Sequence, residues 1–266
     1  MKSKRLIVVS LDALSSIDFD MFSKLPNFKK FIRHAACCRQ VRSVYPSLTY
    51  PAHTSIVTGR TPAHHGIVNN ILLQPERSSP DWYWQRNYIR GTTLYDEVLK
   101  QGKHVAALLW PVTAKSEITW NLPEIFANRR WTNQILTSAA NGTVGYQLML
   151  NHRFGRLRDG IRQPALDNFV HASLKYTLKT YRPDLTLVHF TDLDTQRHHY
   201  GVHSEEAAAA IKRHDERIGE LMHLLHQNRM SVKRDTTVII LGDHSQLDVR
   251  NVILINKLLR EQGYLK

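Results

Sequence analysis

Four short apolar runs, separated by longer amphipathic segments, constrain the fold more than any other feature of this sequence. They lie at residues 5–10, 104–110, 185–190 and 236–241, and each ends in a cluster of polar residues. Short apolar strands that alternate with helices are typical of a mainly parallel sheet with helices on both faces. The sequence therefore predicts an α/β fold with these runs as its central strands.

The segments between the runs have the spacing of amphipathic helices. The clearest is 204–227, where Ser204 can cap the N-terminus, Glu205 and Glu206 complement the helix dipole, and apolar residues form one stripe. Further helices are predicted at 26–34, 51–58, 93–101, 133–150, 165–180 and 249–261, with a long loop or insertion at about 72–90. The 266 residues contain no repeat and no evident linker, which predicts a single domain, 1–266.

The chain is strongly basic. Its 36 Lys and Arg against 23 Asp and Glu give a formal net charge of +13, so its field attracts anions. Because the basic residues are scattered, we expect no stable complex with nucleic acid. The two cysteines, Cys37 and Cys38, are adjacent and exclude a disulfide framework, and no window reaches the roughly 18 apolar residues that span a membrane. We expect a cytoplasmic protein without a membrane segment.

Three of the four predicted strands are followed by side chains that can bind a metal ion. Asp12 follows the first, Asp194 and His198 follow the third, and Asp243 and His244 follow the fourth. Ligands bind beyond the carboxyl ends of the strands in an open α/β sheet. Carboxylate oxygen and imidazole nitrogen together suit Zn²⁺, and paired metal ions serve phosphoryl transfer. The pattern predicts a metal centre with more than one ion.

The most distinctive segment, residues 45–59, reads YPSLTYPAHTSIVTG. Pro46 and Pro51 bracket Thr49, a hydroxyl residue immediately before a predicted helix start. Amides at that helix terminus would face an anion at Thr49. By itself this pattern is more typical of an ordinary helix-capping threonine than of a nucleophile.

The ordered motifs SLDA, YPSLTYPAHTSIVTG, HHGIVNN, LLWPVT, DTQRHHYG and GDHSQ span residues 10–246. In this order they resemble the type I phosphodiesterase/nucleotide pyrophosphatase family of the alkaline phosphatase superfamily. The resemblance implies an alkaline-phosphatase-like sheet and a two-zinc centre. One zinc ion would be held by Asp12, Thr49, Asp243 and His244, and the other by Asp194, His198 and a third histidine downstream.

The resemblance also implies roles for residues outside the metal set. Thr49 would attack phosphorus and form a phosphothreonine intermediate, and Asn70 with the Thr49 amide would hold the phosphoryl oxygens. Tyr50 matches an aromatic residue that stacks on the substrate base. Trp82 and its aromatic neighbours can form a substrate wall or anchor the insertion to the body.

The sequence departs from the family pattern in three places. The segment from Ser245 onward has no histidine, so the second metal site lacks its third family ligand and the C-terminal part of the family domain is expected to be missing. Arg197 and Ala52 stand where the family usually has Gly and Asn. The DHG motif of most members is DHS here, which keeps both ligands.

These features predict a metal-dependent hydrolase of phosphodiester or pyrophosphate bonds that acts on a small nucleotide substrate. Two alternatives remain open: a phosphomonoesterase or phosphonate hydrolase of the same superfamily, since the shared core does not fix the leaving group, and an inactive truncated remnant that binds phosphate or nucleotide. A nucleic-acid-binding module would leave the clustered Asp and His unexplained. The sequence does not indicate an oligomeric state.

Overall fold

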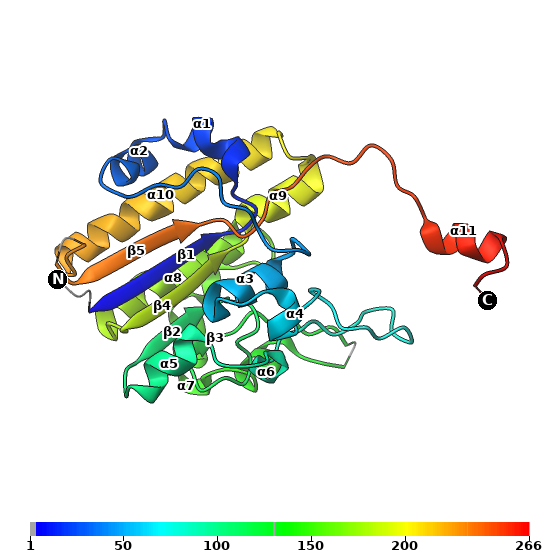
Figure 1. The fold of residues 1–266 in the computed structure, drawn as a ribbon. Helices are drawn as coiled ribbons and strands as arrows, with labels where there is room; N and C mark the ends of the chain where they lie inside the picture. The colour runs from blue at the N-terminus through cyan, green and yellow to red at the C-terminus, as the bar shows by residue number, and fades with distance from the viewer. Residues whose placement is uncertain (1–3, 130, 233, 266) are drawn as a thin grey trace.

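A computed structural model describes residues 4–129, 131–232 and 234–265, and a five-stranded parallel sheet forms its centre (Figure 1). The strands are β1 (Arg5–Leu11), β2 (Val105–Leu108), β3 (Trp120–Leu122), β4 (Leu185–Phe190) and β5 (Thr236–Leu241). Their order across the sheet is β3-β2-β4-β1-β5, and every pair is parallel. The predicted α/β fold and its four strands are confirmed, and β3 is an additional short strand.

The register of the central strands determines where the polar residues after each strand lie. Leu11 of β1 pairs with Phe190 of β4, and Ser10 pairs with Leu241 of β5. The three strands therefore end at the same edge of the sheet. Residues that directly follow them are brought together although they are about 50 to 230 positions apart in sequence, because parallel strands share a carboxyl edge.

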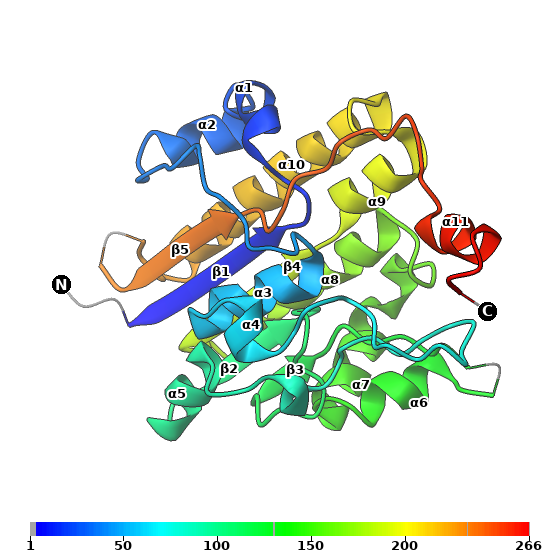
Figure 2. The same cartoon turned by 45° about the vertical axis from the view of Figure 1, so that its right-hand side comes forward.

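Helices cover both faces of the sheet (Figures 1 and 2). They are α1 (Phe19–Phe22), α2 (Pro26–Ile32), α3 (Thr49–Thr58), α4 (Pro62–His65), α5 (Leu94–Lys100), α6 (Gln134–Ala139), α7 (Val144–Phe154), α8 (Ala165–Thr180), α9 (Asp192–Tyr200), α10 (Glu205–Gln227) and α11 (Ile255–Glu261), with short 3-10 turns η1 (Ser16–Asp18), η2 (Arg86–Tyr88) and η3 (Gly155–Leu157). None of the described helices is both long and apolar enough to cross a bilayer.

Side-chain alternation along β1 divides the core into two layers. Ile7 and Val9 pack in one cluster with Leu174 of α8 and other residues of α8 and α10, whereas Val8 packs on the opposite face with Val57 of α3. Successive side chains of a strand point to opposite faces, so an apolar run without alternation requires cover on both sides. This explains why the apolar runs in the sequence are continuous.

The predicted helix 133–150 is two helices in the structure. The chain breaks between α6 and α7 at Gly142, where an added Cβ would lie 2.5 Å from the carbonyl oxygen of Asn121. Thr143, the next residue, accepts a hydrogen bond from the Asn121 amide at 3.1 Å. The residues on each side of Gly142 are helical, as their spacing predicts. Packing of Gly142 and Thr143 against β3 separates the two helices.

The predicted helix 249–261 is shorter in the structure. Only α11 is helical in this region, and it lies away from the body of the molecule with no buried residue (Figures 1 and 2). The predicted insertion 72–90 contains no long helix or strand, and it is fastened by a bridge between Ile71 and Trp82 and by η2. The predicted cap of α10 is confirmed, since Ser204 Oγ accepts from the Ala207 amide at 3.1 Å.

Candidate metal centre and active site

The ends of β1 and β5 bring three of the predicted ligands into contact. His244 Nε2 lies 3.3 Å from Asp12 Oδ1 and 3.4 Å from Asp243 Oδ2. The other oxygen of Asp243 accepts a hydrogen bond from the Ala13 amide at 3.1 Å, which fixes the carboxylate against the turn after β1. The two strand ends thus hold two carboxylates and one imidazole around a common point.

Thr49 joins this group from α3. It is the first helical residue, and Leu48 occupies the N-cap position, so the Thr49 side chain does not cap the helix. Its Oγ1 lies 3.2 Å from His244 Nε2. The first amides of a helix have no partner within it. In the first turn of α3 the Tyr50 amide bonds to Asn70 Oδ1 and Pro51 has no N–H, so the Thr49 amide is the donor left beside the Thr49 hydroxyl.

The donor set fits a divalent metal ion. Asp12 Oδ1 and Asp243 Oδ2 are buried without a hydrogen-bond partner among the described residues, although buried polar atoms normally have one. Ligands about 2.0–2.2 Å from a tetrahedral ion lie about 3.3–3.6 Å apart, close to the separations from His244 Nε2. Burial raises the pKa of Asp12 well above its ordinary value, and the nearby Asp243 and Asp194 carboxylates raise it further. A bound cation would satisfy the unpaired oxygens and oppose this mutual repulsion.

Asp194 and His198 form a second group on α9, four residues apart on one face of the helix. His198 Nε2 lies 3.4 Å from Asp194 Oδ1, and the hydrogen bond to Asp194 raises the pKa of His198. Gln246 Nε2 is 2.7 Å from the same oxygen and 3.1 Å from His198 Nε2. Ligand atoms of Asp12, Asp194 and His244 all lie within 4.8 Å of one another, so the two groups share one site.

Arg197 connects α9 to the turn that follows β1. Its buried guanidinium donates to the carbonyl of Ala13 at 2.5 Å and to the carboxylate of Asp18. The family pattern has Gly at this position. In this structure the contacts of Arg197 explain what the arginine does there. It ties the helix that carries Asp194 to the strand end that carries Asp12.

Two buried histidines support the site from beneath. His53 Nδ1 donates to the carbonyl oxygen of Thr49 at 2.8 Å and its Nε2 accepts from Ser10 Oγ at 2.9 Å; burial and the neighbouring His189 lower the pKa of His53 to about 3. His189 Nε2 donates to Asp12 Oδ2 at 3.0 Å, and Nδ1 lies 3.3 Å from Glu124 Oε2. Burial opposes the charged form of His189, but these two carboxylates together raise its pKa well above the ordinary value.

The sequence patterns did not identify His189 and Glu124 as residues of the site. His189 is the fifth residue of the buried run LTLVHF, and a single polar residue within such a run was the available signal. Glu124 follows β3, a three-residue strand that the apolar pattern does not predict. His189 contacts Asp12 and Glu124 contacts His189, in both cases between segments that are distant in sequence.

A cavity of about 520 Å³ opens over the clustered residues. Its lining includes Asp12, Thr49, Asn70, Asp194, His198 and His244, together with Trp82, Phe126 and Phe169. Asn70 Oδ1 accepts a hydrogen bond from the Tyr50 amide at 2.9 Å, so its Nδ2 remains available as a donor toward the cavity. The structure thus gathers Asn70 and all the predicted ligands except Asp243, which lies beneath the cavity in contact with His244.

The structure does not place Tyr50 for stacking on a substrate. Its side chain has no exposed surface and does not line the cavity, because it packs edge-to-face against Trp82, with ring centroids 5.3 Å apart. Trp82 is the aromatic residue of this pair that reaches the cavity wall. Trp84, its neighbour, is buried in the same aromatic cluster and anchors the 72–90 segment to the body.

A sequence profile described as type I phosphodiesterase / nucleotide pyrophosphatase matches residues 6–266, almost the whole chain. The chain belongs to this family. Human ectonucleotide pyrophosphatase/phosphodiesterase family member 1 is 26% identical over 255 residues, which cover 91% of this chain and 24% of the relative. A venom phosphodiesterase of Macrovipera lebetinus is 25% identical over 251 residues, which cover 90% and 25%. The chain spans about a quarter of the length of these curated relatives.

Two solved structures share the fold of this chain. A murine ectonucleotide pyrophosphatase / phosphodiesterase 5, an inactive variant in complex with AMP, matches with a TM-score of 0.64 at 18% identity, over 94% of this chain and 59% of that one. Phosphonoacetate hydrolase of Sinorhizobium meliloti in complex with phosphonoacetate matches with a TM-score of 0.67 at 22% identity, over 98% and 62%. These matches confirm the alkaline-phosphatase-like fold.

For a type I phosphodiesterase / nucleotide pyrophosphatase, the arrangement contains the components of phosphoryl transfer. It has a hydroxyl at a helix start, carboxylates and imidazoles that can hold cations beside that hydroxyl, and the side-chain amide of Asn70 in the wall of the cavity. Preorganised donors aimed at a developing charge are the main source of stabilisation in such reactions. The cavity is large enough to admit a small organic phosphate.

Proposed function

We propose that this protein hydrolyses phosphodiester or pyrophosphate bonds in nucleotides, with Thr49 as its nucleophile. Its proposed cofactors are divalent metal ions, of which Zn²⁺ is the first candidate. The observation that carries the proposal is the Thr49 hydroxyl 3.2 Å from His244 Nε2, beside two buried carboxylate oxygens that have no hydrogen-bond partner among the described residues. Family membership and the names of the curated relatives support the same class of reaction.

We propose that Asp12, Thr49, Asp243 and His244 hold one metal ion and that Asp194 and His198 contribute to a second. Bound Zn²⁺ lowers the pKa of a coordinated hydroxyl and reduces the charge on the phosphoryl oxygens. The orphaned oxygens of Asp12 and Asp243 support the first assignment. The spacing of Asp194 and His198 over one turn of α9 supports the second.

The reaction has two displacements. Thr49 Oγ attacks phosphorus, the bond to the leaving oxygen breaks, and the leaving group departs with the electron pair and takes up a proton. A water molecule then attacks the phosphothreonine, the bond from phosphorus to Thr49 Oγ breaks, and Thr49 regains its proton. A covalent intermediate divides one difficult displacement into two easier ones. His53 holds the Thr49 carbonyl at 2.8 Å and so fixes the direction of the nucleophile.

Two donors of the chain serve the phosphoryl oxygens in this mechanism. They are the Thr49 amide, at the unpaired first turn of α3, and Asn70 Nδ2, whose oxygen is already held by the Tyr50 amide. The donors are fixed before substrate binds, so little reorganisation accompanies the increase of charge in the transition state.

Hydrolysis of the p-nitrophenyl ester of a nucleoside 5′-monophosphate in added Zn²⁺ tests the proposal. Thr49→Ala removes the nucleophile and is expected to lower kcat by a factor of about 10³ or more, as for other covalent nucleophiles. Thr58→Ala is the matched control, since Thr58 lies at the far end of the same helix, where its hydroxyl bonds to the Thr54 carbonyl and the Arg60 amide, and it does not line the cavity. Equal activity of Thr49→Ala and the unchanged chain would contradict the assignment.

The same assay distinguishes the alternatives. A p-nitrophenyl monoester that is turned over faster than the diester would favour a phosphomonoesterase, and hydrolysis of a phosphonate in place of both would favour a phosphonate hydrolase. Zinc bound at about one ion per chain, without Thr49-dependent turnover, would support a binding protein instead.

A further inference from the structure

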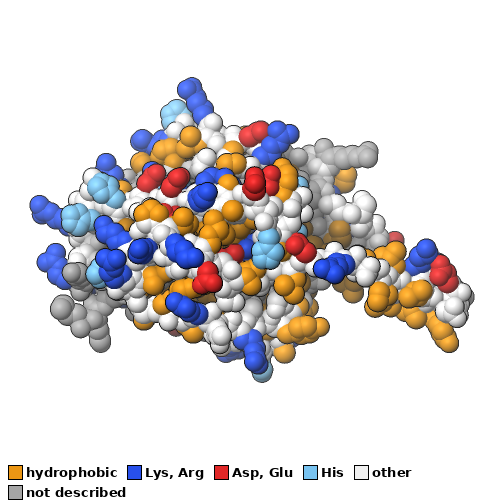
Figure 3. Space-filling view, turned by 90° about the horizontal axis from the view of Figure 1, so that it is seen from above, with side chains coloured by type: hydrophobic (Ala, Val, Ile, Leu, Met, Phe, Trp, Pro, Cys, Tyr) orange, Lys and Arg blue, Asp and Glu red, His pale blue; other side chains and the backbone are white. Residues whose placement is uncertain are grey.

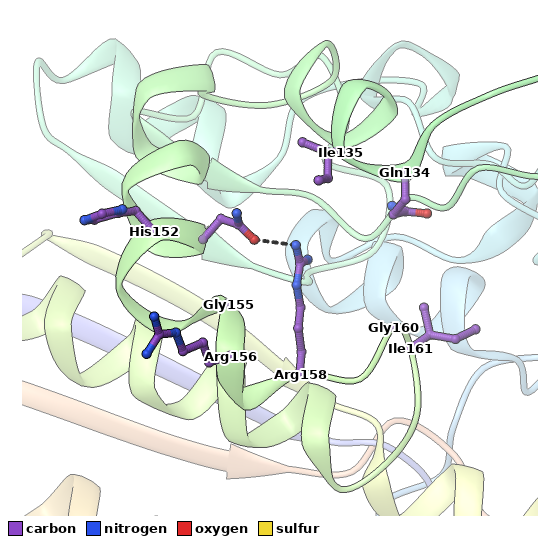
Figure 4. A pocket seen from close by; sticks show the side chains of 9 residues that line it. Gln134, Ile135, His152, Gly155, Arg156, Arg158, Gly160 and Ile161 are labelled. Atoms are coloured by element: carbon purple, nitrogen blue, oxygen red, sulfur yellow. Dashed lines mark hydrogen bonds between the residues drawn. The ribbon is translucent and has the colours of Figure 1, made fainter.

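A second cavity adjoins the candidate active site. It has a volume of about 700 Å³ and is lined by residues of α6, α7 and the segment that joins η3 to α8. Gln134, Arg158, Gly160 and Ile161 line both this cavity and the one that contains Thr49. The two cavities therefore adjoin and are together called the hollow, with Arg158 in the wall that they share, and Figure 4 shows Arg158 extending toward α7 below Gln134 and Ile135.

Arg158 is held in one orientation but has unused donors. Its Nη2 donates to Asn151 Oδ1 at 2.5 Å, and its guanidinium carbon lies 5.1 Å from the ring centroid of Phe169, which lines the first cavity. It forms no ion pair with any residue in the described ranges, and its Nε and Nη1 have no hydrogen-bond partner there. The guanidinium of this partly buried arginine is thus held by a neutral amide and not by a carboxylate.

Charge is distributed unequally along the hollow. The Thr49 end carries Asp12, Glu124 and Asp194, whereas the second cavity is lined by Arg156 and Arg158 and by no acidic residue among those described. An elongated anion that enters the hollow would therefore find its counter-charges at the arginine end. The guanidinium fork is suited to two oxygens of one phosphate group.

We propose that the Arg158 end of the hollow is a subsite for a phosphate group of the substrate that is not attacked. The subsite selects substrates with a second anionic group, such as the outer phosphates of a nucleoside polyphosphate. This inference rests on the proposed function for the reaction, and on the shared cavity and the unpaired Arg158 for the subsite. Arg158 is a positioning and specificity residue, since it makes no contact with Thr49 or the metal-binding residues.

Selectivity between two substrates tests the subsite. Arg158→Gln is expected to lower kcat/KM for a nucleoside triphosphate about ten- to a hundredfold, the range for one charge-assisted hydrogen-bonded contact. The p-nitrophenyl ester of the nucleoside monophosphate has no outer phosphate, and its kcat/KM is expected to stay within about twofold. Arg162→Gln is the control, because Arg162 loses the same charge nearby but pairs with Asp159 and lines neither cavity.

Equal losses on both substrates, or no loss on the triphosphate, would overturn the subsite. Arg158→Lys keeps the charge without the fork and provides a second variant if the glutamine variant does not fold. For Arg158→Lys we expect kcat/KM for the triphosphate to fall about threefold or more, with no such fall for the p-nitrophenyl ester. The absence of this selective loss would count against the subsite.

Binding of inorganic pyrophosphate separates this inference from the proposed function. Calorimetric titration of the chain in EDTA requires no turnover and no metal ion. Arg158→Gln is expected to weaken pyrophosphate binding about tenfold, and Arg162→Gln by less than about twofold. If the unchanged chain hydrolyses nothing but shows this dependence, only the proposed function fails. If Arg158→Gln binds pyrophosphate as the unchanged chain does, the subsite fails whether or not the chain is active.

Discussion

At the residue scale, the carboxylates of Asp12 and Asp243 meet His244 in a buried space where two of their oxygens have no hydrogen-bond partner in the described part of the chain. A cation that binds only the folded chain stabilises it by mass action, by about 2.7 kcal/mol at a hundred times the dissociation constant. In a domain of this size we expect Zn²⁺ to raise the unfolding midpoint by roughly 5–10 °C. Asp243→Asn should remove most of this shift, because it removes a charged ligand.

Thermal unfolding with Zn²⁺ and with EDTA measures this effect. Asp159→Asn is the control, because Asp159 is exposed and pairs only with Arg162 on the surface. A Zn²⁺-dependent shift that is the same in Asp243→Asn and in the unchanged chain would mean that the ion binds elsewhere.

Residue patterns in the sequence predicted only part of this site. Asp12, Asp194 and His244 were found because parallel strands and the helix after β4 place their ends together, which is a property of the fold class. His189 and Arg158 were not singled out. Their importance depends on contacts with Asp12 and with a cavity wall, and no spacing along the chain encodes such contacts.

At the scale of elements, a buried ion-pair network joins α9 to α10 and so positions Asp194 and His198. Asp192, the first residue of α9, is fully buried and accepts from Arg213 Nε at 2.7 Å and Arg217 Nη1 at 3.3 Å. Removing one partner of a buried pair costs about 3–5 kcal/mol, because the other charge stays buried. We expect Asp192→Ala to lower the free energy of unfolding by that amount.

Urea denaturation of Asp192→Ala checks this value. The exposed pair of Asp159 and Arg162 provides the comparison, since exposed pairs contribute about 0–1 kcal/mol and Asp159→Ala should change the unfolding free energy by no more. Equal effects of the two substitutions would show that the network does not connect the helices.

A buried histidine of α10 makes the helix packing sensitive to acid. Burial, with the nearby Arg217 charge, lowers the pKa of His214 to about 3, and Arg217 Nη1 donates to His214 Nδ1 at 3.3 Å. Unfolded histidine binds a proton near pH 6.5. Between about pH 6.5 and 3 the unfolded chain therefore binds the additional proton, so this contribution to stability is complete above pH 6.5 and decreases as the pH falls.

The expected slope from His214 approaches about 1.4 kcal/mol per pH unit within this window. Urea unfolding at several pH values between 7.5 and 5 measures it, and His214→Gln should reduce the slope by nearly that amount. His226→Gln, at an exposed position near the end of the same helix, is the control. An unchanged slope in His214→Gln would show that this residue is not the acid-sensitive group.

Elements differed in how well the sequence predicted them. The strands β1, β4 and β5 and the helix α10 have uninterrupted apolar runs or stripes, and their positions were predicted closely. The helix α9 has a polar sequence, DLDTQRHHY, and no apolar stripe, so only its tertiary contacts reveal it as a helix. One of these contacts is Asp167, a residue of α8 that accepts from the amide of Asp192 at 3.1 Å.

At the scale of the whole molecule, the face seen from above has mixed side-chain types except at one end. Seen from above, Lys and Arg side chains are interspersed with acidic and hydrophobic ones over the body, while hydrophobic side chains gather on the projecting C-terminal part (Figure 3). The mixed surface agrees with the scattered basic residues of the sequence. The apolar side chains of α11, among them Ile255, Leu258 and Leu259, are exposed because the helix packs against no buried surface.

This separation of α11 from the core leads to a prediction for the molecule as a whole. A chain that ends at residue 250 loses exposed apolar surface but no buried contact of the body, so its unfolding midpoint should stay within about 2 °C of that of the full chain. Binding of a hydrophobic dye, and concentration-dependent association measured by light scattering, should both decrease because large exposed apolar patches promote them. The double variant Leu258→Lys, Leu259→Lys is the matched control, since it removes apolar surface without shortening the chain, and it should lower dye binding similarly. A large fall in the midpoint of the shortened chain would show instead that this segment packs on the body and contributes to its stability.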